Sequence, residues 1–206
     1  MILKVYLKEF FSQFDILVTG AVFLAATVWI LPGLDQGGVW LAILAGMVGY
    51  ACSEYLIHRF FFHLKPPKNP WLLKLLKRLH YDHHVDPQNR KLLFLPIWYS
   101  FPLIALTSAG VYALTGNLLW TVAFAVGVMG YLLHYEWMHF IAHRPVKPFT
   151  PWGRYMKKVH LWHHFKNEHY WFGVTQPFLD MGLGTYRRER ETERSETVRD
   201  LERRPS

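Results

Sequence analysis

Residues 118–143, LLWTVAFAVGVMGYLLHYEWMHFIAH, form an apolar run that ends in closely spaced histidines. An α-helix rises about 1.5 Å per residue, so about 20 residues cross a hydrocarbon core of about 30 Å. Three more runs are of comparable length and hydrophobicity. The four predicted spans are Ile16–Leu34, Val39–Phe62, Leu92–Leu114 and Leu118–Ala142. The short connections at 32–38 and 115–117 indicate two helical hairpins, and the sequence therefore predicts an all-α integral membrane protein with four transmembrane helices.

The basic residues lie outside these apolar runs. No Lys or Arg occurs between Lys8 and Arg59 or between Lys91 and Arg144, so all 23 fall on one side of a four-span arrangement. Segments rich in Lys and Arg stay in the cytoplasm. We therefore expect both termini and the histidine clusters described below on the cytoplasmic side. The compact size and the lack of a retrieval tail rich in Lys and Arg favour a bacterial inner membrane.

The composition restricts the partners and the chemistry of the chain. Hydrophobic residues make up 51% of the sequence, yet the formal net charge is +8. Because the apolar runs are long, we expect the basic residues to meet anionic lipid headgroups rather than nucleic acid. Cys52 is the single cysteine. A single cysteine excludes an intrachain disulfide framework and a cysteine-based zinc site.

Two stretches outside the spans have the pattern of amphipathic helices, with leucine or aromatic residues set against lysine and arginine. They are Pro70–His84 and Pro151–His164. We expect them to form a cytosolic cap at the membrane interface. Residues 1–186 are predicted to be one membrane-embedded domain. The last segment, 187–206, mixes Arg and Glu with few apolar residues, and we expect a solvated helix or a disordered tail without a chemical role.

The twelve histidines are concentrated in the cap and at the adjoining ends of the spans. Their clusters are His58-x4-His63, His80-x2-His83-His84, His134-x4-His139-x3-His143 and His160-x2-His163-His164, with His169 just beyond. Helical positions i, i+3 and i+4 share a face, so each H-x2-HH triplet can direct three imidazoles at one locus. His58 and His63 diverge by about 140° on an α-helix. They either serve different metals or mark the point where the helix breaks ahead of Pro66.

Ten of these histidines exceed the ligand capacity of one tetrahedral or octahedral ion, which predicts a site for two metals. His134 and His169 stand outside the repeated spacings and remain candidates for additional ligands. Four carboxylates near the clusters are candidates to orient the imidazoles through their second ring nitrogen, with a salt bridge to Lys or Arg as the alternative role. They are Glu54, Asp82, Glu136 and Asp180.

The two halves of the chain resemble each other. The segment 49–71 has a counterpart 81 residues later in its glycine–tyrosine pair, its histidine and its proline–tryptophan pair. The triplet His80-x2-His83-His84 recurs 80 residues later as His160-x2-His163-His164. Each half is thus expected to be a helical hairpin followed by an amphipathic helix that carries histidines. Two such halves that face each other would build one shared site.

The ligand types alone do not choose the metal, because imidazole suits iron, zinc and copper. A paired-metal site at the edge of hydrocarbon favours oxygen chemistry on an apolar substrate over hydrolysis, for which one zinc and a water suffice. A haem protein of the membrane b type would pair its histidines across the helices, whereas these lie in triplets at one end. Metal transport would require ligating groups within the membrane, and the predicted spans have almost none.

The histidine spacings resemble the fatty acid hydroxylase and sterol desaturase superfamily over about Gly49 to Tyr186. Residues 54–60, EYLIHRF, are similar to the first histidine box of the fatty acid 2-hydroxylases. Phe172-Gly173-Val174, followed by Asp180 and Gly184-Thr185-Tyr186, is similar to the segment that follows the last box. These motifs are specific for the superfamily but not for a substrate.

The resemblance implies a four-helix membrane anchor under a cytosolic histidine cap, with two non-haem iron ions and the use of dioxygen and two electrons. Zinc is able to replace the iron in purified protein. The positions carried over as ligands are His58, His63, His80, His83, His84, His139, His143, His160, His163 and His164.

The resemblance also implies the reaction, namely hydroxylation of an acyl chain of a fatty acid or membrane lipid. The chain has no room for a fused cytochrome b5 domain, so we expect a separate electron donor, either cytochrome b5-like or ferredoxin-like. Two alternatives stay open at this point. The same scaffold could serve a carotenoid-ring hydroxylase or a sterol or lipid desaturase, and a non-catalytic metal-binding membrane protein would belong to another class.

Overall fold

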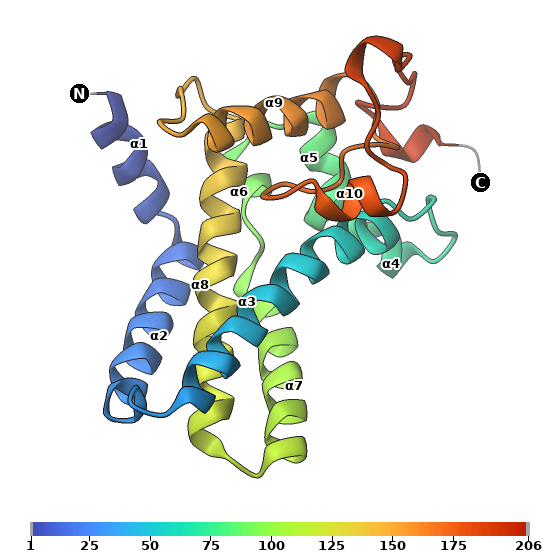
Figure 1. Ribbon diagram of the computed structural model, residues 1–206. Coiled ribbons are helices and arrows are strands. Elements are labelled where there is room, and N and C mark those ends of the chain that lie inside the picture. Colours follow the sequence, from blue (N-terminus) through green and yellow to red (C-terminus); the bar gives the residue numbers. More distant parts are fainter. Residues whose placement is uncertain (1, 205–206) are drawn as a thin grey trace. The chain divides into compact units, whose positions relative to one another are not determined.

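The computed structural model describes residues 2–204, and its regular elements over that range are all helical (Figure 1). The α-helices are α1 (Ile2–Phe11), α2 (Phe14–Ile30), α3 (Gly37–Ile57), α4 (Pro70–Leu76), α5 (Asp82–Val85), α6 (Arg90–Leu93), α7 (Ile97–Thr115), α8 (Leu118–Ala142), α9 (Pro151–Phe165) and α10 (Phe178–Gly182). Two π-helical turns are η2 (His58–Phe62) and η3 (Lys77–Tyr81). Short 3-10 turns are η1 (Leu31–Gly33), η4 (Glu189–Glu191) and η5 (Leu201–Arg203).

The chain divides into two compact units. The first unit comprises Met1–Ala51 and Leu95–Glu136, and the second comprises Cys52–Phe94 and Trp137–Ser206. Helices α3 and α8 each begin in the first unit and continue into the second. The first unit thus holds most of the apolar helices, and the second holds the cap.

Within residues 2–204, four helical segments are long and apolar enough to cross a membrane, which confirms the predicted number. They are Phe14–Gly33, Gly37–Phe62, Arg90–Thr115 and Leu118–Ala142. The third segment is not one continuous helix, because α6 ends at Leu93 and α7 starts after the extended residue Pro96. Helix α1 was not predicted from the sequence.

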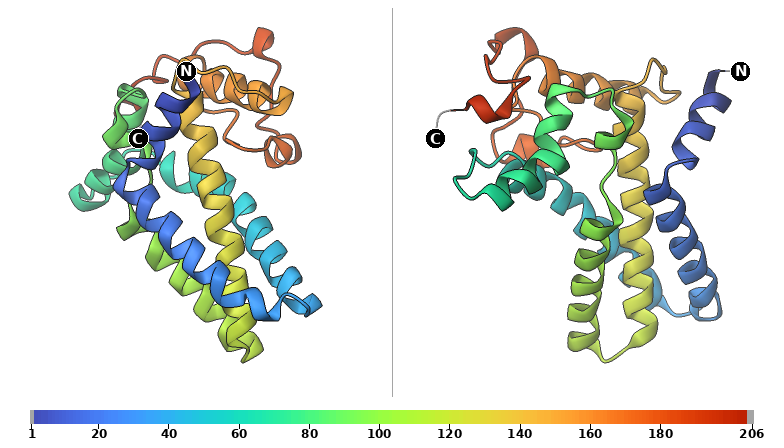
Figure 2. Two further views of the ribbon diagram at one scale, coloured as in Figure 1. Left: turned by 90° about the vertical axis from the view of Figure 1, so that its left-hand side faces the viewer. Right: turned by 180° about the vertical axis from the view of Figure 1, so that it is seen from behind.

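In the first unit, α3 and α8 approach each other closely at two glycines. A Cβ atom added to Gly46 would lie 2.2 Å from the carbonyl oxygen of Phe124, and one added to Gly127 would lie 2.0 Å from that of Ile43. Only residues without a side chain allow this contact, which is typical of packing between membrane helices. Figure 2 shows the antiparallel hairpin of α7 and α8 in this unit, which turns at Gly116 with a φ of 61°.

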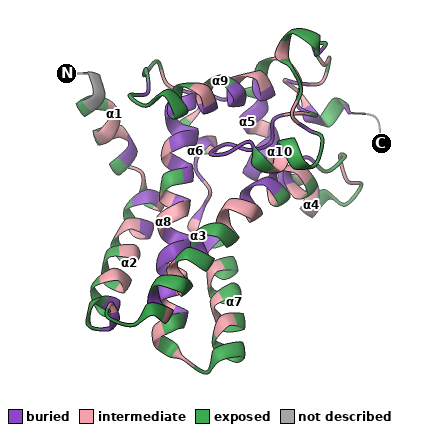
Figure 3. Ribbon diagram, in the orientation of Figure 1, coloured by how far each residue is buried: buried purple, intermediate pink, exposed green. Residues whose placement is uncertain are grey.

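Many residues on the helices of the first unit are exposed (Figure 3), and large apolar side chains are among them. Leu24, Leu41 and Leu106 keep 62%, 69% and 69% of their surface accessible, and Trp29 keeps 50%. Water-soluble proteins rarely expose contiguous apolar surfaces of this kind, whereas lipid chains cover them without cost. The exposure therefore agrees with four helices that span a bilayer.

Both predicted cap helices are present in the second unit. Each begins with a polar N-cap and a proline: Asn69 accepts hydrogen bonds from the backbone N–H groups of Trp71 and Leu72, and Thr150 accepts one from Gly153. Helix α9 covers the whole predicted range. The other predicted helix, from Pro70 to His84, is divided into α4, η3 and α5 by a π-helical turn.

The C-terminal segment differs from its prediction as a solvated or disordered tail. Val198 and Leu201 are buried, and Leu201 packs against Leu76 and Tyr81 in the second unit. Apolar residues are sparse in this segment, but these two are placed where they enter the core. The domain boundary between residues 186 and 187 stays a prediction.

Candidate metal centre

Ten buried histidines form two groups in the second unit. The first group is His58, His63, His80, His84 and His163. The second group is His83, His139, His143, His160 and His164. Within each group, one ring nitrogen from every residue lies within 4.8 Å of the corresponding atoms of the others. These are the ten positions that the sequence spacing singled out, brought together as two sets of five.

Each H-x2-HH triplet is divided between the two groups, contrary to the expectation that it would point at one locus. His80 and His84 enter the first group and His83 enters the second, while His160 and His164 enter the second and His163 enters the first. The cause is helical geometry. On an α-helix, positions i and i+4 are about 40° apart, whereas i+3 lies about 60° to the other side of i.

A π-helical turn brings His58 and His63 into the same group. The backbone N–H of His63 donates to the carbonyl oxygen of His58 at 3.1 Å, which is an i to i+5 hydrogen bond. One extra residue per turn places positions five apart on one face, as positions four apart are in an α-helix. His58-x4-His63 in the first half is therefore spatially equivalent to His139-x3-His143 in the second half.

The internal repeat maps one group onto the other. Each half supplies four histidines to its own group and one to the other group: His83 from the first half joins the second group, and His163 from the second half joins the first. The prediction of a site shared by two halves is thus correct in outline. The halves exchange the middle histidine of each triplet.

Burial keeps the imidazoles neutral. It lowers the pKa of His84 to about 3, and a hydrogen bond to a backbone carbonyl only partly opposes this. The pKa values of seven further histidines lie well below the usual value. Burial is the largest cause, and the neighbouring histidines lower these pKa values further. The histidines concerned are His63, His80, His83, His143, His160, His163 and His164. A neutral imidazole has a free lone pair, which is the form that binds metal.

Backbone carbonyls fix the tautomers of four histidines. Nδ1 donates to the carbonyl oxygen of the partner residue because a carbonyl can only accept. In the first group the pairs are His58 with Phe172 at 2.5 Å, His84 with Val198 at 2.9 Å and His163 with Tyr170 at 2.8 Å. In the second group the pair is His139 with Leu93 at 3.0 Å. Each of these rings consequently presents an unprotonated Nε2.

These Nε2 atoms face ring nitrogens of other histidines. His63 Nε2 lies 3.0 Å from His163 Nε2 and 2.8 Å from His80 Nε2, and His139 Nε2 lies 2.9 Å from His83 Nε2. In the first group, three lone pairs and at most two N–H groups converge, so hydrogen bonds alone cannot satisfy the set. Neither ring nitrogen of His164 has a hydrogen-bond partner among the described residues. A metal ion in each group would satisfy the converging lone pairs, so the residues fit a two-metal centre.

The two additional candidates lie outside both groups. His134 belongs to the first unit, where its ring contacts that of Tyr131 with centroids 5.6 Å apart. The side chain of His169 is 57% exposed, and its Nε2 lies 3.5 Å from a carboxylate oxygen of Glu168. Within residues 2–204, neither belongs to a group of potential metal ligands.

In the described chain, the four carboxylates do not accept hydrogen bonds from the ligand imidazoles, and backbone carbonyls accept from four of the ten rings instead. Glu54 instead accepts from the backbone N–H groups of Val174 and Thr175 at 3.0 and 2.9 Å. Asp82 lies 3.8 Å from Lys77 at the surface, which is the alternative role of a salt bridge. In the first unit, Glu136 accepts from the backbone N–H of Leu95 at 3.0 Å.

Asp180 holds the loop whose backbone carbonyls orient two histidines of the first group. Its carboxylate accepts from the backbone N–H groups of Phe172 and Gly173 at 2.9 and 2.7 Å, and burial raises its pKa. Trp171 in this loop is fully buried with a φ of 61°, a conformation that side chains other than glycine rarely adopt. The carbonyls on either side, of Tyr170 and Phe172, bind His163 and His58. Unfavourable backbone of this kind persists where the surrounding contacts hold it.

Sequence reasoning missed the residues that orient the ligands. Four of them act through main-chain carbonyls, which every residue type carries, so their identities contain no signal. They are Leu93, Tyr170, Phe172 and Val198. The motif around Phe172 and Asp180 was noticed, but its role in holding His58 and His163 required the structure.

Known proteins are similar to this chain in sequence and in fold. The family model for fatty acid hydroxylases matches residues 43–185, more than half of the chain and the whole histidine array. The chain belongs to the fatty acid hydroxylase family. This confirms the resemblance seen in the histidine boxes.

Curated fatty acid hydroxylases match most of the chain. The ceramide very long chain fatty acid hydroxylase SCS7 of Saccharomyces cerevisiae is 36% identical over 159 residues, which cover 76% of this chain and 40% of that protein. The dihydroceramide fatty acyl 2-hydroxylase FAH2 of Arabidopsis thaliana is 29% identical over 163 residues, covering 74% of this chain and 63% of that one. This fatty acid hydroxylase chain therefore spans less than two thirds of either relative.

A solved fatty acid hydroxylase shares the fold. The structure of full-length Scs7p, in which only the hydroxylase domain is visible, matches with a TM-score of 0.77 at 29% sequence identity. The match covers 87% of this chain and 67% of that chain. The fold of this chain is thus similar to that of a known hydroxylase domain.

Proposed function

We propose that this protein is a membrane-bound non-haem di-iron monooxygenase that hydroxylates an acyl chain of a lipid. The observation that carries the proposal is the pair of five-histidine groups, buried and neutral, with their ring nitrogens converging. Bound iron would supply the activation of dioxygen, with one oxygen atom entering a C–H bond and the other leaving as water as two electrons and two protons are consumed. The ten histidines of the two groups are the proposed ligands.

The protein's own residues position the ligands and keep water away. The carbonyls of Phe172, Tyr170 and Val198 hold three imidazoles of the first group in one tautomer, so little reorganisation accompanies metal binding. The burial of all ten rings excludes bulk water from the reacting centre. Fixed ligands and a dry site are the protein's part in such chemistry, since the cofactor performs the oxidation.

A lipid substrate agrees with the surface of the second unit. Phe149 and Phe178 keep 77% and 68% of their surface accessible, and the ring of Phe178 stacks on that of Trp152 with centroids 6.2 Å apart. Exposed aromatic groups beside basic helices are typical of contact with a membrane interface. The relatives are named for ceramide, dihydroceramide and fatty acyl substrates, and we propose an acyl chain of a membrane lipid or fatty acid here.

The electrons would come from a separate donor of the cytochrome b5 or ferredoxin type. We place the site and both termini on the cytoplasmic side, in accordance with the distribution of the basic residues, and we propose a bacterial inner membrane as the location. Zinc would be expected in place of iron when the protein is overproduced, because imidazole ligands accept both metals.

The test combines metal content with product analysis. The protein is expressed in iron-supplemented bacteria under ¹⁸O₂, and the extracted lipids are examined by mass spectrometry beside elemental analysis of the detergent-purified protein. We expect two metal ions per chain and acyl chains heavier by one ¹⁸O atom. Both signals should fall in the variants His83→Ala and His163→Ala.

Other products would point elsewhere. Acyl chains or sterols that lose two hydrogens without gaining oxygen would indicate a desaturase, and label in carotenoid rings would indicate a ring hydroxylase. Two metals per chain with unchanged lipids, despite a working electron donor, would indicate a metal-binding protein without this activity. A chain that retains no metal after gentle purification would contradict the di-iron proposal itself.

A further inference from the structure

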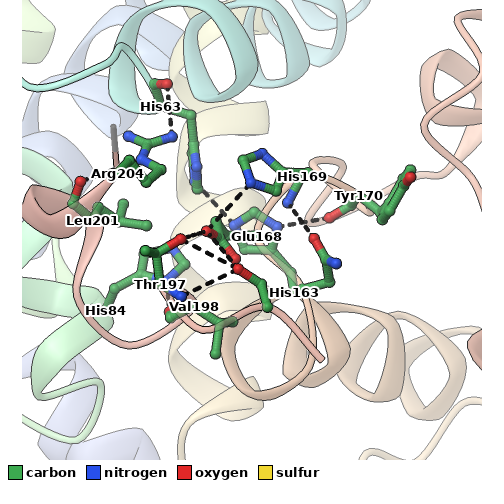
Figure 4. A network of polar contacts seen from close by, with 12 residues as sticks. His63, His84, His163, Glu168, His169, Tyr170, Thr197, Val198, Leu201 and Arg204 are labelled. Carbon is green, nitrogen blue, oxygen red and sulfur yellow. Dashed lines mark hydrogen bonds and ion pairs between the residues drawn. The ribbon is translucent and has the colours of Figure 1, made fainter. Parts of the chain in front are cut away.

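The C-terminal segment Ser195–Arg204, here named the strap, contacts the first histidine group directly (Figure 4). The carbonyl oxygen of Val198 accepts from His84 Nδ1 at 2.9 Å. Arg199 Nε returns a hydrogen bond to the carbonyl oxygen of His84 at 2.8 Å. Arg204 Nη1 donates to the carbonyl oxygen of His63 at 3.0 Å. Two histidines of one group are therefore held by a segment far from them in the sequence.

The strap is attached at both of its ends. At the first end, the fully buried carboxylate of Glu168 accepts hydrogen bonds from the hydroxyls of Ser195 (3.0 Å) and Thr197. At the other end, Leu201 is fully buried, and Arg204 Nη2 donates to the carbonyl oxygen of Leu64 at 2.6 Å. These attachments place Val198 between two fixed points, so its carbonyl is held in position for His84.

The strap contributes to a difference between the two groups, together with the Tyr170 carbonyl, which lies outside the strap. The internal repeat equates His84 with His164, and His163 with His83. His84 and His163 each donate Nδ1 to a carbonyl, whereas Nδ1 of His164 and of His83 has no partner among the described residues. A partner on the second nitrogen fixes the orientation of a ligating imidazole and increases its basicity, and its loss typically weakens metal binding by about 10- to 100-fold.

We propose that the strap is a positioning element of the first metal group, through Val198, Thr197 and Arg204, and that the first group consequently retains its metal more tightly than the second. The inference rests on the proposed two-metal function. It assigns a role to the charged C-terminal segment that its composition did not suggest.

The test measures the release of metal from each group separately. Detergent-purified protein is loaded with zinc(II), and release to a colorimetric chelator is followed over time. The variants His139→Ala and His58→Ala, which impair the second and the first group respectively, assign the slow and fast phases. We expect the slow phase to belong to the first group, and Arg204→Ala to accelerate that phase by about tenfold or more while the fast phase stays unchanged.

Arg203→Ala is the matched control. Arg203 is the neighbouring arginine on the same turn, its side chain is 79% exposed, and its ion pair with Asp200 lies at the surface. This variant should release both metals at wild-type rates. Thr197→Val provides a second, milder change, because it removes the hydroxyl that donates to Glu168 while the volume of the side chain is nearly preserved. It should also accelerate the slow phase.

The outcomes separate this inference from the proposed function. Wild-type protein that holds two zinc ions, with Arg204→Ala and Thr197→Val releasing both at unchanged rates, would overturn the role of the strap alone. Equal acceleration of both phases would also overturn it, because a purely structural segment would loosen both groups. Wild-type protein that holds no zinc would overturn the two-metal function and the strap with it.

Discussion

At the scale of single residues, His83 and His163 join the two halves of the centre. Each lies on the amphipathic helix of one half but belongs to the metal group of the other half. Neither half alone therefore supplies all five ligands of one group. A helix places positions i and i+4 on one side and i+3 on the other, so the exchange follows directly from the H-x2-HH spacing.

The exchange predicts which substitutions act on the same metal. We expect His58→Ala and His163→Ala, although they lie in different halves, to affect the same ion, so that the double variant retains about one metal per chain, as each single variant does. The pair His58→Ala and His83→Ala lies within one half, yet it should deplete both ions. Elemental analysis of the purified variants checks this.

The reverse pattern would contradict the grouping. If His58→Ala with His83→Ala retained one metal and His58→Ala with His163→Ala retained none, each half would bind its own ion. Circular dichroism of the same preparations serves as the control, because equal helix content shows that the differences in metal content come from the ligands and not from unfolding.

The ten histidines were predictable because ligand spacing on a helix is a property of the residue types themselves. Their division into two groups was not predicted: each triplet was expected to point at one locus, and the pairing of His58 with His63 depends on the π-helical turn. The orienting groups were missed for a different reason. Main-chain carbonyls accept hydrogen bonds from any ring that lies near, so Asp180 gave a signal while the carbonyl of Phe172, whose N–H it binds, did not.

At the scale of elements, hydropathy located all four spanning segments because burial in lipid demands long apolar runs. It did not locate the break before α7, although Pro96 marked it, because the apolar run continues across the break. The strap was missed for the opposite reason. Two apolar residues, Val198 and Leu201, are too few for a hydropathy signal, yet both are buried.

The close contact of α3 and α8 predicts that replacing either glycine at this contact destabilises the protein, whereas replacing Gly110 in α7 does not. In Gly46→Ala and Gly127→Ala, the new methyl group meets the backbone of the facing helix, so the helices must separate. We expect each variant to lose about 1–3 kcal/mol of stability. Gly110→Ala, with no atom within 4 Å of the added Cβ, should be neutral or stabilising by up to about 1 kcal/mol.

Thermal unfolding in detergent, followed by circular dichroism, measures the three variants side by side. Gly110 is the matched control, since it also lies within a spanning helix and undergoes the same substitution. Equal melting temperatures for all three would show that α3 and α8 do not depend on backbone contact at these positions.

At the scale of the whole molecule, charge and hydrophobicity are separated along the chain. The apolar helices expose leucine and tryptophan, and the 23 basic residues all lie in segments that a four-span arrangement places on one side. The same four-span arrangement would place the ten histidines of the two groups on the side of the basic residues. An oxidation site at the boundary between the membrane and the aqueous phase would receive an apolar chain from the membrane and electrons from the aqueous phase.

The charge distribution predicts the topology of the protein in the membrane. Cys52 is first replaced by serine, and single cysteines are then introduced at Asp35 and Thr115, in the short connections, or at Lys91 and Arg188, in the basic segments. In spheroplasts of the expression host, a membrane-impermeant maleimide should label the first two positions from outside and the last two only after lysis, because positively charged segments remain in the cytoplasm. Labelling of Lys91→Cys and Arg188→Cys in intact spheroplasts would invert the topology and place the histidines outside, where a cytoplasmic electron donor could not reach them.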